Sequence, residues 1–370
     1  MIEQINIENY KSIRDAKIPL KNLNVLIGSN GVGKSNFISF FDLVKNMLDQ
    51  NLGRFILEQG GIERFLYCGS KNSKYIKGTI DFNNTNAFFF TLNPTIDNKA
   101  FIQESGNYSI QESGDYFNGF GDATKDYSTW HKQYYDKAVE ESKIMQIDNS
   151  RVKYLQSYIK NLIVYHFHDS SKDSPLRSSC SVDDNHMLKH DGSNLAAFLY
   201  RLQQTEPQSL RVIEGVIRSI APYFKGFKLQ PSRIIPDQIK LEWEQYNSDM
   251  YLDAQSFSDG TIRFIALATV LLQPNLPATI IIDEPELGLH PSAINKLAAL
   301  MKRTAKKTQL IVATQSVNLV DCFDAEDIVV VDRKDNQTEF KRLSSDDLSA
   351  WIDDYSMGEM WEKNVIGGQP

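Results

Sequence analysis

A glycine-rich run near the amino terminus has the residue types and spacing of a phosphate-binding loop. It fits the pattern GxxxxGK(S/T) and comprises Gly28, Ser29, Asn30, Gly31, Val32, Gly33, Lys34 and Ser35, with Asn36 next in the chain. Glycines let backbone N–H groups close around an anion, and the start of a helix adds the positive end of its dipole. Lys34 is expected to reach the β- and γ-phosphates of a nucleotide, and the Ser35 hydroxyl to ligate Mg²⁺.

A second chemical signal is a pair of carboxylates at the end of an apolar segment. Thr279–Ile282 is typical of a buried strand and runs into Asp283, Glu284 and Pro285. In a chain with a phosphate loop this is the Walker B position, where Asp283 would hold Mg²⁺ through water. Glu284 would polarise the attacking water as a general base. Asp-Glu-Pro alone is a common strand-to-turn sequence, so the phosphate loop elsewhere in the chain carries this interpretation.

Strands and helices must hold these two motifs in place. The apolar segment Leu23–Ile27 predicts a strand that leads into the phosphate loop, and the spacing of apolar residues from Lys34 to Met47 predicts a helix after it. Further strands are predicted at 309–313 and 328–331, and further helices at 260–272 and 293–306. Strands that alternate with helices at both ends of the chain predict an α/β fold with parallel strands.

The middle of the chain and its last residues are less regular. Residues 105–121, rich in Gly, Asn and aromatic side chains, predict loops, and the pattern from Tyr134 to Met145 predicts a helix. Basic and aromatic residues interleave between Lys125 and Lys160, a pattern that can bind nucleic acid. The acidic residues among them favour a solvated amphipathic face instead. From residue 344 the chain is acidic and shows no clear period.

Composition excludes several classes of protein. The chain has 370 residues, of which 41% are hydrophobic and 24% charged, so it is not collagen-like, disordered or dominated by heptads. A net charge of -7 argues against nonspecific coating of nucleic acid, although it allows a local basic groove. Three widely spaced cysteines indicate a reducing compartment. Because no apolar run approaches about 18 residues, we expect a soluble, cytoplasmic protein without membrane contact.

Three motifs together resemble the ABC-type ATPases of the RecF and SMC class. They are the phosphate loop, Ser256–Thr261 (SFSDGT) and Asp283–Pro291 (DEPELGLHP), and the opening Glu8–Ile13 (ENYKSI) is similar to that of the class. Within the class, the chain is most similar to the stand-alone bacterial ATPases called AAA_21-like, which are related to the ATPase half of OLD nucleases. The segments Tyr165–Asp169 and His190–Leu195 also match that group, so the resemblance covers nearly the whole chain.

The resemblance implies an α/β P-loop NTPase fold, an ABC-type ATPase head with an inserted helical lobe. The expected segments are 1–98 with the phosphate loop, 99–274 as the inserted lobe, 275–343 with the acidic strand end, and 344–370 as an acidic tail. In this class a signature loop contacts ATP bound to a second protomer, and here that role falls to Ser258, Asp259 and Gly260. A plain helix N-cap at Ser258 or Asp259 is the other interpretation, and both can hold at once.

The other motifs of the class match this sequence less fully. The signature loop reads FSDGT instead of the LSGGQ of transporters, which favours the RecF-like side. Gly288-Leu289-His290 would form the D-loop, and the switch position is Gln315, where many ABC ATPases have His. Because a Gln side chain cannot become a cation, hydrolysis is expected to be slow. Lys11 and Ser12 resemble nucleotide-contacting positions or are exposed strand-end residues, and Gln103 is the first candidate for the Q-loop glutamine.

The sequence therefore predicts an ATPase that binds ATP and Mg²⁺ and works as an ATP-sandwiched homodimer or higher homo-oligomer. The setting that the resemblance implies is a nucleic-acid-linked bacterial defence or toxin-like system with a separately encoded nuclease or other effector. A RecF-like DNA-repair ATPase, which would bind duplex DNA more tightly with ATP, is the alternative. A transporter's energising subunit and a small-molecule kinase remain as weaker alternatives, and the FSDGT loop counts against both.

Overall fold

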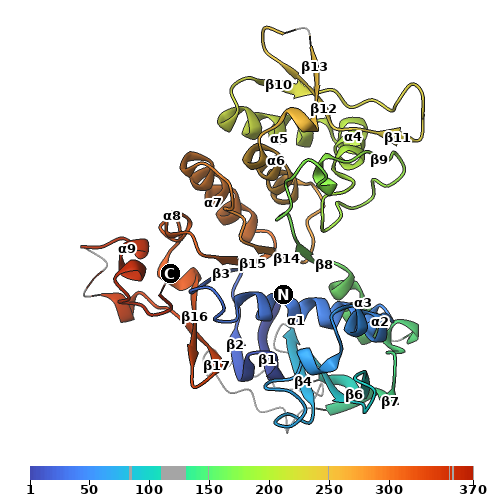
Figure 1. The fold of residues 1–370 in the computed structure, drawn as a ribbon, viewed down its shortest axis with the longest axis vertical. Helices are drawn as coiled ribbons and strands as arrows, with labels where there is room; N and C mark the ends of the chain where they lie inside the picture. The colour runs from blue at the N-terminus through green and yellow to red at the C-terminus, as the bar shows by residue number, and fades with distance from the viewer. Residues whose placement is uncertain are drawn as a thin grey trace, which may run out of the picture. The chain divides into compact units, whose positions relative to one another are not determined.

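The computed structural model describes residues 1–82, 86–109, 131–148, 150–248, 250–349, 351 and 354–369 (Figure 1). Contacts divide the chain into a first unit, residues 1–162 with 325–370, and a second unit, residues 163–324. The segments expected from the sequence have other limits than these units, and they stay a prediction. The chain has a mixed α/β fold, as the sequence predicts.

An antiparallel sheet of the strand order β2-β1-β4-β5-β6-β7 forms one layer of the first unit. The strands are β1 (Ile2–Tyr10), β2 (Ile13–Pro19), β4 (Ile76–Phe82), β5 (Asn86–Pro94), β6 (Ala100–Ser109) and β7 (His131–Val139). Ile5 pairs with Ile80, and Phe90 with Gly78, which places apolar side chains on one face of the sheet. This face is buried against the helix that follows the phosphate loop.

A second group of strands in the first unit contains β3 (Leu23–Ile27), β16 (Ile328–Lys334) and β17 (Gln337–Arg342). Strand β3 runs parallel to β16, and β16 forms a hairpin with β17 through Asp335 and Asn336, both with positive φ. Asp and Asn tolerate this conformation better than other side chains, as a two-residue hairpin turn requires. The hairpin brings β17 back beside the phosphate loop.

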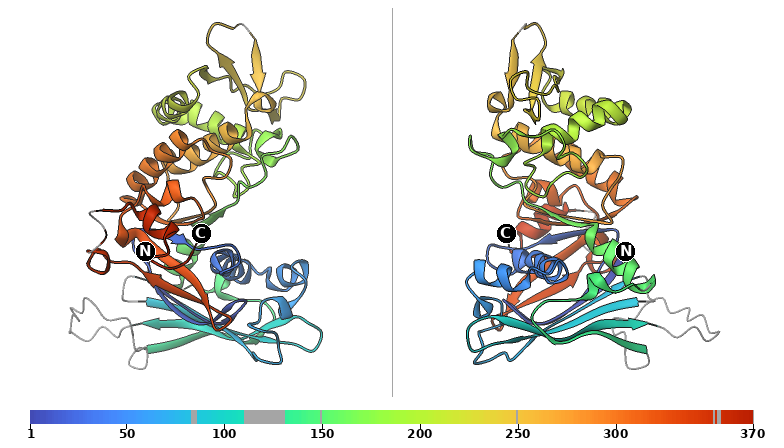
Figure 2. Two further views of the ribbon diagram at one scale, coloured as in Figure 1. Left: turned by 60° about the vertical axis from the view of Figure 1, so that its left-hand side comes forward. Right: turned by 90° about the vertical axis from the view of Figure 1, so that its right-hand side faces the viewer.

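Helix α1 (Lys34–Leu48) lies between these two groups of strands and joins them through its apolar side chains. The ring of Phe40 stacks on Phe90 of β5 at 5.8 Å, and the ring of Phe37 contacts Phe340 of β17 at 5.4 Å. Figure 2 shows α1, in blue, above the cyan and green strands. The other helices of the first unit are α2 (Leu52–Glu58), α3 (Ser150–Lys160), α9 (Met357–Glu362) and the short turns η1 (Ile62–Arg64), η3 (Ile144–Gln146), η6 (Ala325–Asp327) and η7 (Asp346–Leu348).

The second unit holds the acidic strand end on a parallel pair of strands. Strand β14 (Thr279–Asp283) pairs with β15 (Gln309–Thr314), and β8 (Leu162–Tyr165) follows β14 in the strand order. Helices α6 (Asp259–Leu272), α7 (Pro291–Ala305) and α8 (Val317–Val320) accompany these strands. The rest of the unit is α4 (Leu195–Thr205), α5 (Pro207–Ile220), β9 (Cys180–Ser181), β10 (Phe224–Phe227), β11 (Gln238–Ile239), β12 (Glu242–Gln245), β13 (Tyr251–Asp253), η4 (Pro175–Arg177) and η5 (Ala254–Ser256).

The predicted strands and helices around the two motifs are confirmed, but the predicted helix from Tyr134 to Met145 is wrong. Residues 131–139 form β7, which pairs with β6 along most of its length. Asp136 fixes this pairing, because its Oδ2 accepts hydrogen bonds from Ser105 Oγ at 2.6 Å and Ser142 Oγ at 2.7 Å. Residues 105–109, predicted as loop, belong to β6, and 110–121 lie outside the described residues.

The end of the chain is also more ordered than its sequence pattern indicates. Helix α9 begins at a capping box, in which Ser356 Oγ accepts from the Glu359 N–H and the Glu359 carboxylate accepts from the Ser356 N–H. The S-x-x-E spacing of this box is a helix-start signal that could have been read from the sequence. Within the ranges that the structure describes, every helix falls short of the length and apolarity needed to cross a bilayer.

Candidate nucleotide site

The phosphate loop takes a backbone path that requires glycine. Gly31 has φ +79° and Gly33 has φ +119°, a region that other residues rarely adopt. A side chain at Gly28 would place its Cβ 2.3 Å from the carbonyl oxygen of Val331, and one at Gly33 would place it 2.2 Å from Thr338 Oγ1. Strands β16 and β17 of the first unit therefore pack directly against the loop.

Lys34 is buried and folds back over the loop. Its ammonium Nζ donates to the carbonyl oxygens of Gly28 at 2.5 Å and Ser29 at 3.0 Å, and 4% of the residue is exposed. Among the described residues, no side chain caps the amino terminus of α1, and its first turn holds no acidic residue. The N–H groups of that turn and one ammonium are thus gathered at a single place, as phosphate binding requires.

Three polar side chains hold the loop from outside. Asn36 Nδ2 donates to Ser12 Oγ at 2.7 Å, and Thr338 Oγ1 lies 2.7 Å from the same oxygen. The Thr338 hydroxyl also donates to the Val32 carbonyl at 2.6 Å. Ser12 was a candidate from the sequence, whereas Thr338 was missed because it lies about 300 residues further along the chain. It reaches the loop only through the β16–β17 hairpin.

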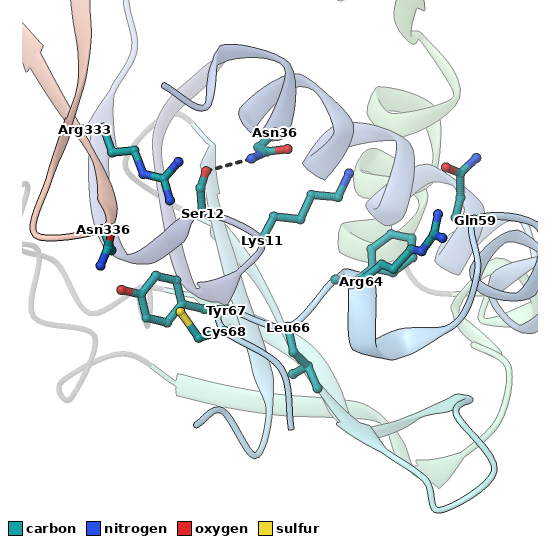
Figure 3. A pocket seen from close by; sticks show the side chains of 11 residues that line it. Lys11, Ser12, Asn36, Gln59, Arg64, Leu66, Tyr67, Cys68, Arg333 and Asn336 are labelled. Atoms are coloured by element: carbon teal, nitrogen blue, oxygen red, sulfur yellow. Dashed lines mark hydrogen bonds between the residues drawn. The ribbon is translucent and has the colours of Figure 1, made fainter. Parts of the chain in front are cut away.

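A cavity of about 510 Å³ opens beside these residues (Figure 3). Its charged lining residues are the cations Lys11, Arg64 and Arg333, so it favours an anionic ligand. Figure 3 shows the Arg333 guanidinium on the side of Ser12 and the Ser12–Asn36 hydrogen bond. Burial lowers the pKa of Lys11, whose ammonium donates to Ser39 Oγ at 2.8 Å. Lys11 is therefore not the plainly exposed strand-end residue that was one of its two interpretations.

Gly368 lies close to the phosphate loop and is held there by a hydrogen bond from Trp361. Trp361 is fully buried and its indole N–H donates to the Gly368 carbonyl. Gly368 has φ +63°, and a Cβ there would lie 2.7 Å from Val330 Cγ1 and 3.6 Å from Gly28 Cα. Gly368, within the acidic tail predicted from the sequence, thus lies beside the first glycine of the motif.

The acidic strand end brings Glu284 and Gln315 together. Glu284 follows β14 with φ +45°, an uncommon conformation for a residue with a side chain, and its N–H donates to the Ala313 carbonyl at 2.8 Å. The Gln315 amide Nε2 donates to Glu284 Oε1. The residue expected to activate water and the residue at the switch position are therefore hydrogen-bonded neighbours.

Glu286 organises this pair and was not singled out from the sequence. Its Oε1 accepts from Thr314 Oγ1 at 2.6 Å and from the Gln315 N–H at 3.0 Å. Burial raises the pKa of Glu286, and the nearby Glu284 carboxylate acts in the same direction. The second Glu of the run DEPE was the available signal, but spacing alone could not tell which strand end it would contact.

The segment predicted to be the signature loop meets the segment predicted to be the D-loop within the second unit. Ser258 caps α6, since its Oγ accepts from the Thr261 N–H at 3.2 Å, and Asp259 begins the helix. A Cβ on Gly260 would lie 2.3 Å from the Gly288 carbonyl oxygen, so the two loops touch through backbone atoms. Ser258 and Asp259 stay exposed. The N-cap interpretation is confirmed, and it leaves both residues accessible to a ligand.

Gln103, the first candidate for the Q-loop, lies within β6. It is exposed and its Oε1 lies 3.5 Å from Asn93 Nδ2 of the neighbouring strand β5. A glutamine in the middle of a paired strand is not placed in a loop at all. This position therefore gives no support to the candidate.

Comparison with known proteins decides the family. A family model described as "AAA domain, putative AbiEii toxin, Type IV TA system" matches residues 23–321. The chain belongs to the AAA_21 family. As an AAA_21 protein it is an ATPase, and its fold is similar to that of Smc heads.

One curated relative and two solved structures illustrate this AAA_21 protein's similarities. The "Retron Ec83 probable ATPase" of Escherichia coli is 21% identical over 397 residues, which cover 88% of this chain and 70% of that protein. An Smc head bound to the C-winged helix domain of ScpA has TM-score 0.61 at 17% identity, covering 94% of this chain and 99% of that one. An Smc head from Pyrococcus furiosus bound to the C-terminal domain of ScpA has TM-score 0.55 at 15% identity, covering 95% and 98%.

Replacement of Thr338 by Val is expected to weaken nucleotide binding. The substitution keeps the shape of the side chain and removes the hydroxyl that holds Val32 and Ser12, at a cost of about 1 kcal/mol in unfolding free energy. Thr308→Val is the matched control, because the Thr308 hydroxyl bonds to the carbonyls of Pro277 and Ala278 in the second unit. Calorimetric titration with ATP should show a lower affinity for Thr338→Val alone. Equal affinities in the two variants would contradict the role of Thr338.

Replacement of Glu286 by Gln is expected to change how stability depends on pH. A folded-state pKa above the unfolded value means that the stability from this group is present at low pH and lost as pH rises through the folded pKa. Gln keeps an acceptor oxygen for Thr314 and Gln315 without the buried charge. The melting temperature of Glu286→Gln relative to the natural chain should therefore rise between about pH 4 and pH 8. If the difference in melting temperature between Glu286→Gln and the natural chain is constant over this range, the charge of Glu286 does not destabilise the folded protein.

Proposed function

We propose that the phosphate loop and the acidic strand end act on one ATP molecule, and that hydrolysis takes place in an ATP-sandwiched dimer. We further propose that the chain is the sensor or regulator subunit of a nucleic-acid-linked bacterial defence or toxin-like system with a separately encoded effector. The observation that carries the chemical part is the contact between Gln315 and Glu284. It couples the predicted water-activating carboxylate to the predicted switch residue.

The binding half of the mechanism follows from the phosphate loop. Lys34 and the N–H groups at the start of α1, which no described side chain caps, would interact with the β- and γ-phosphates. The cations of the adjoining cavity, Lys11 among them, favour the rest of an anionic nucleotide in the same place. Ser35 and Asp283 offer hydroxyl and carboxylate oxygens, the hard donors that Mg²⁺ prefers, so the donor set fits this ion. Bound Mg²⁺ would neutralise charge on the phosphates.

The chemical half depends on the second unit. Glu284 would accept a proton from the attacking water, while the Gln315 amide holds the carboxylate in place through a hydrogen bond. The backbone of Glu284, with φ +45°, is in a conformation that costs about 1–3 kcal/mol and persists only where the surrounding structure holds it. Because Gln315 cannot carry a positive charge, it would stabilise the transition state less than a protonated His, so we expect slow turnover.

The exposure of the predicted signature loop supports the proposed dimer. Ser258 and Asp259 are exposed at the start of α6, so the Ser258 hydroxyl is accessible to a nucleotide bound by a neighbouring protomer. The setting in a defence or toxin-like system is supported by the family description and by the relative named as a retron ATPase. A RecF-like repair function would instead show itself as a duplex-DNA affinity that increases with ATP.

Lys34→Ala is expected to lose tight ATP binding and to keep its fold. The loss follows from removal of the Lys34 ammonium at the loop, whereas Lys45→Ala, in the last turn of the same helix, should bind ATP as before. Calorimetry with ATP and Mg²⁺ measures both affinities, and circular dichroism checks the fold. Undiminished affinity in folded Lys34→Ala would refute the site.

Glu284→Gln is expected to bind ATP and to hydrolyse it at least about 10²-fold more slowly, since an amide cannot accept the proton of the attacking water. Phosphate release under saturating ATP gives the turnover number, and a binding titration gives the affinity. Turnover equal to that of the natural chain would remove Glu284 from the mechanism.

The sandwich is tested by mixing two inactive variants. Ser258→Arg fills the dimer seam and leaves its own phosphate loop intact, while Lys34→Ala does the reverse. In a mixed dimer one composite site carries both changes and the other carries neither. Activity should therefore return to at most about half per heterodimer, because the two sites can be coupled. Full hydrolysis by monomeric Ser258→Arg in analytical ultracentrifugation would rule out the sandwich.

A further inference from the structure

Arg177 is a buried arginine whose donors are almost all directed at the signature segment. It ends the short turn η4, and 3% of its side chain is exposed. Its Nη1 donates to the carbonyls of Ala254 and, at 3.0 Å, Phe257, while Nη2 pairs with Asp259 Oδ1 at 2.8 Å. Its Nε donates to the Ser170 carbonyl at 3.1 Å. One rigid guanidinium thus holds three points of the chain between residues 254 and 259.

Arg263 is a second buried arginine, one turn into α6. It is 4% exposed, and its donors reach the carbonyls of Phe167 at 2.7 Å and His168 at 2.5 Å. A further donor reaches the carbonyl of Leu287, in the turn that follows the acidic strand end. Burial lowers the pKa of Arg263, which is consistent with a cation that is bound mainly by neutral carbonyls.

The two guanidiniums meet at the same short segment of the second unit. Ser170 gives its carbonyl to Arg177, and its Oγ lies 3.5 Å from Arg263 Nη2. Desolvation of two cations is costly unless their donors are satisfied, and a planar fork with five N–H groups can satisfy several carbonyls at once. Lysine could not do this, because it is a point charge on a flexible stem. The arrangement is therefore specific to arginine.

From these contacts we propose that Arg177 and Arg263 are positioning residues for the ATPase reaction. Arg177 fixes the signature loop, and Arg263 fixes the helix after that loop to the turn at Leu287. Together they set where Ser258 stands relative to the strand end that carries Glu284. This inference rests on the proposed sandwich, in which Ser258 acts on the nucleotide of the neighbouring protomer.

A loosened signature loop should lower turnover without changing ATP binding by the same chain's phosphate loop. Arg177→Gln has fewer donors, a shorter reach and no charge for Asp259. We expect its kcat to fall between about tenfold and 10²-fold, because a misplacement of about 1 Å at a reacting group has effects of this size. The ATP dissociation constant should stay within about threefold. The amides of residues 257–262 should exchange hydrogen faster than in the natural chain.

Arg201→Gln is the matched control. Arg201 lies in the same unit and also holds a loop through backbone carbonyls, those of Asn185 and His186. Its replacement should leave the exchange of residues 257–262 and kcat unchanged. If Arg177→Gln is poorly folded by its melting curve, Arg177→Lys keeps a cation for Asp259 and loses the fork. It should still show faster exchange and lower kcat.

Mixing experiments separate this inference from the sandwich itself. Arg177→Gln mixed with Lys34→Ala should regain activity, since one composite site is then free of both changes, whereas a general loss of structure would not be rescued. Ser258→Arg mixed with Lys34→Ala is the reference pair. If the reference pair regains activity and the Arg177 pair does not, the positioning role is overturned and the sandwich stands.

If neither pair regains activity in verified heterodimers, either the two sites are obligately coupled or the sandwich is wrong, and the exchange and kcat of the Arg177 variants then decide this inference. Normal exchange of residues 257–262 and normal kcat in folded Arg177→Gln and Arg177→Lys would also overturn it, whatever the mixtures show. Faster exchange with lower kcat, unchanged ATP affinity and rescue by Lys34→Ala is the result that supports it.

Discussion

The first unit depends on the close approach of the β16–β17 hairpin to the phosphate loop. The Val331 carbonyl would lie 2.3 Å from a Cβ at position 28, and the Thr338 hydroxyl bonds to the Val32 carbonyl. Only glycine permits such an approach, and only a strand that returns from the hairpin supplies the hydroxyl. The loop, the helix after it and Gly368 are arranged around this contact.

The second unit differs in that it buries several charged side chains, those of Glu286, Arg177 and Arg263. Glu286 accepts two hydrogen bonds from the end of β15, and the two buried arginines are surrounded by carbonyl oxygens. Each buried charge is held by partners that come from a distant part of the chain. Such networks cost free energy when incomplete, so they define one arrangement of the strand end and its loops more sharply than apolar packing would.

The local motifs were predictable because their chemistry is written in consecutive residues. The phosphate loop needs glycines at fixed spacing, and the strand before it needs a short apolar run. The strand at 279–282 is a short apolar run of the same kind. Predictions failed where pairing partners decide the structure. The pattern from Tyr134 to Met145 suits a helix, yet residues 131–139 form β7 because β6 offers an edge and Asp136 bonds to Ser105 and Ser142.

The sequence by itself thus determined the fold class, the phosphate loop with Lys34 and the acidic strand end with Glu284. These depend on spacing within a few residues and on local backbone preference. Only the tertiary structure decided that Thr338 holds the loop, that Glu286 organises Gln315, and that Arg177 lies on the signature segment. The physical reason is that each of these contacts joins residues about 30 to 300 positions apart. Their register is fixed by strand pairing and burial, which no local pattern encodes.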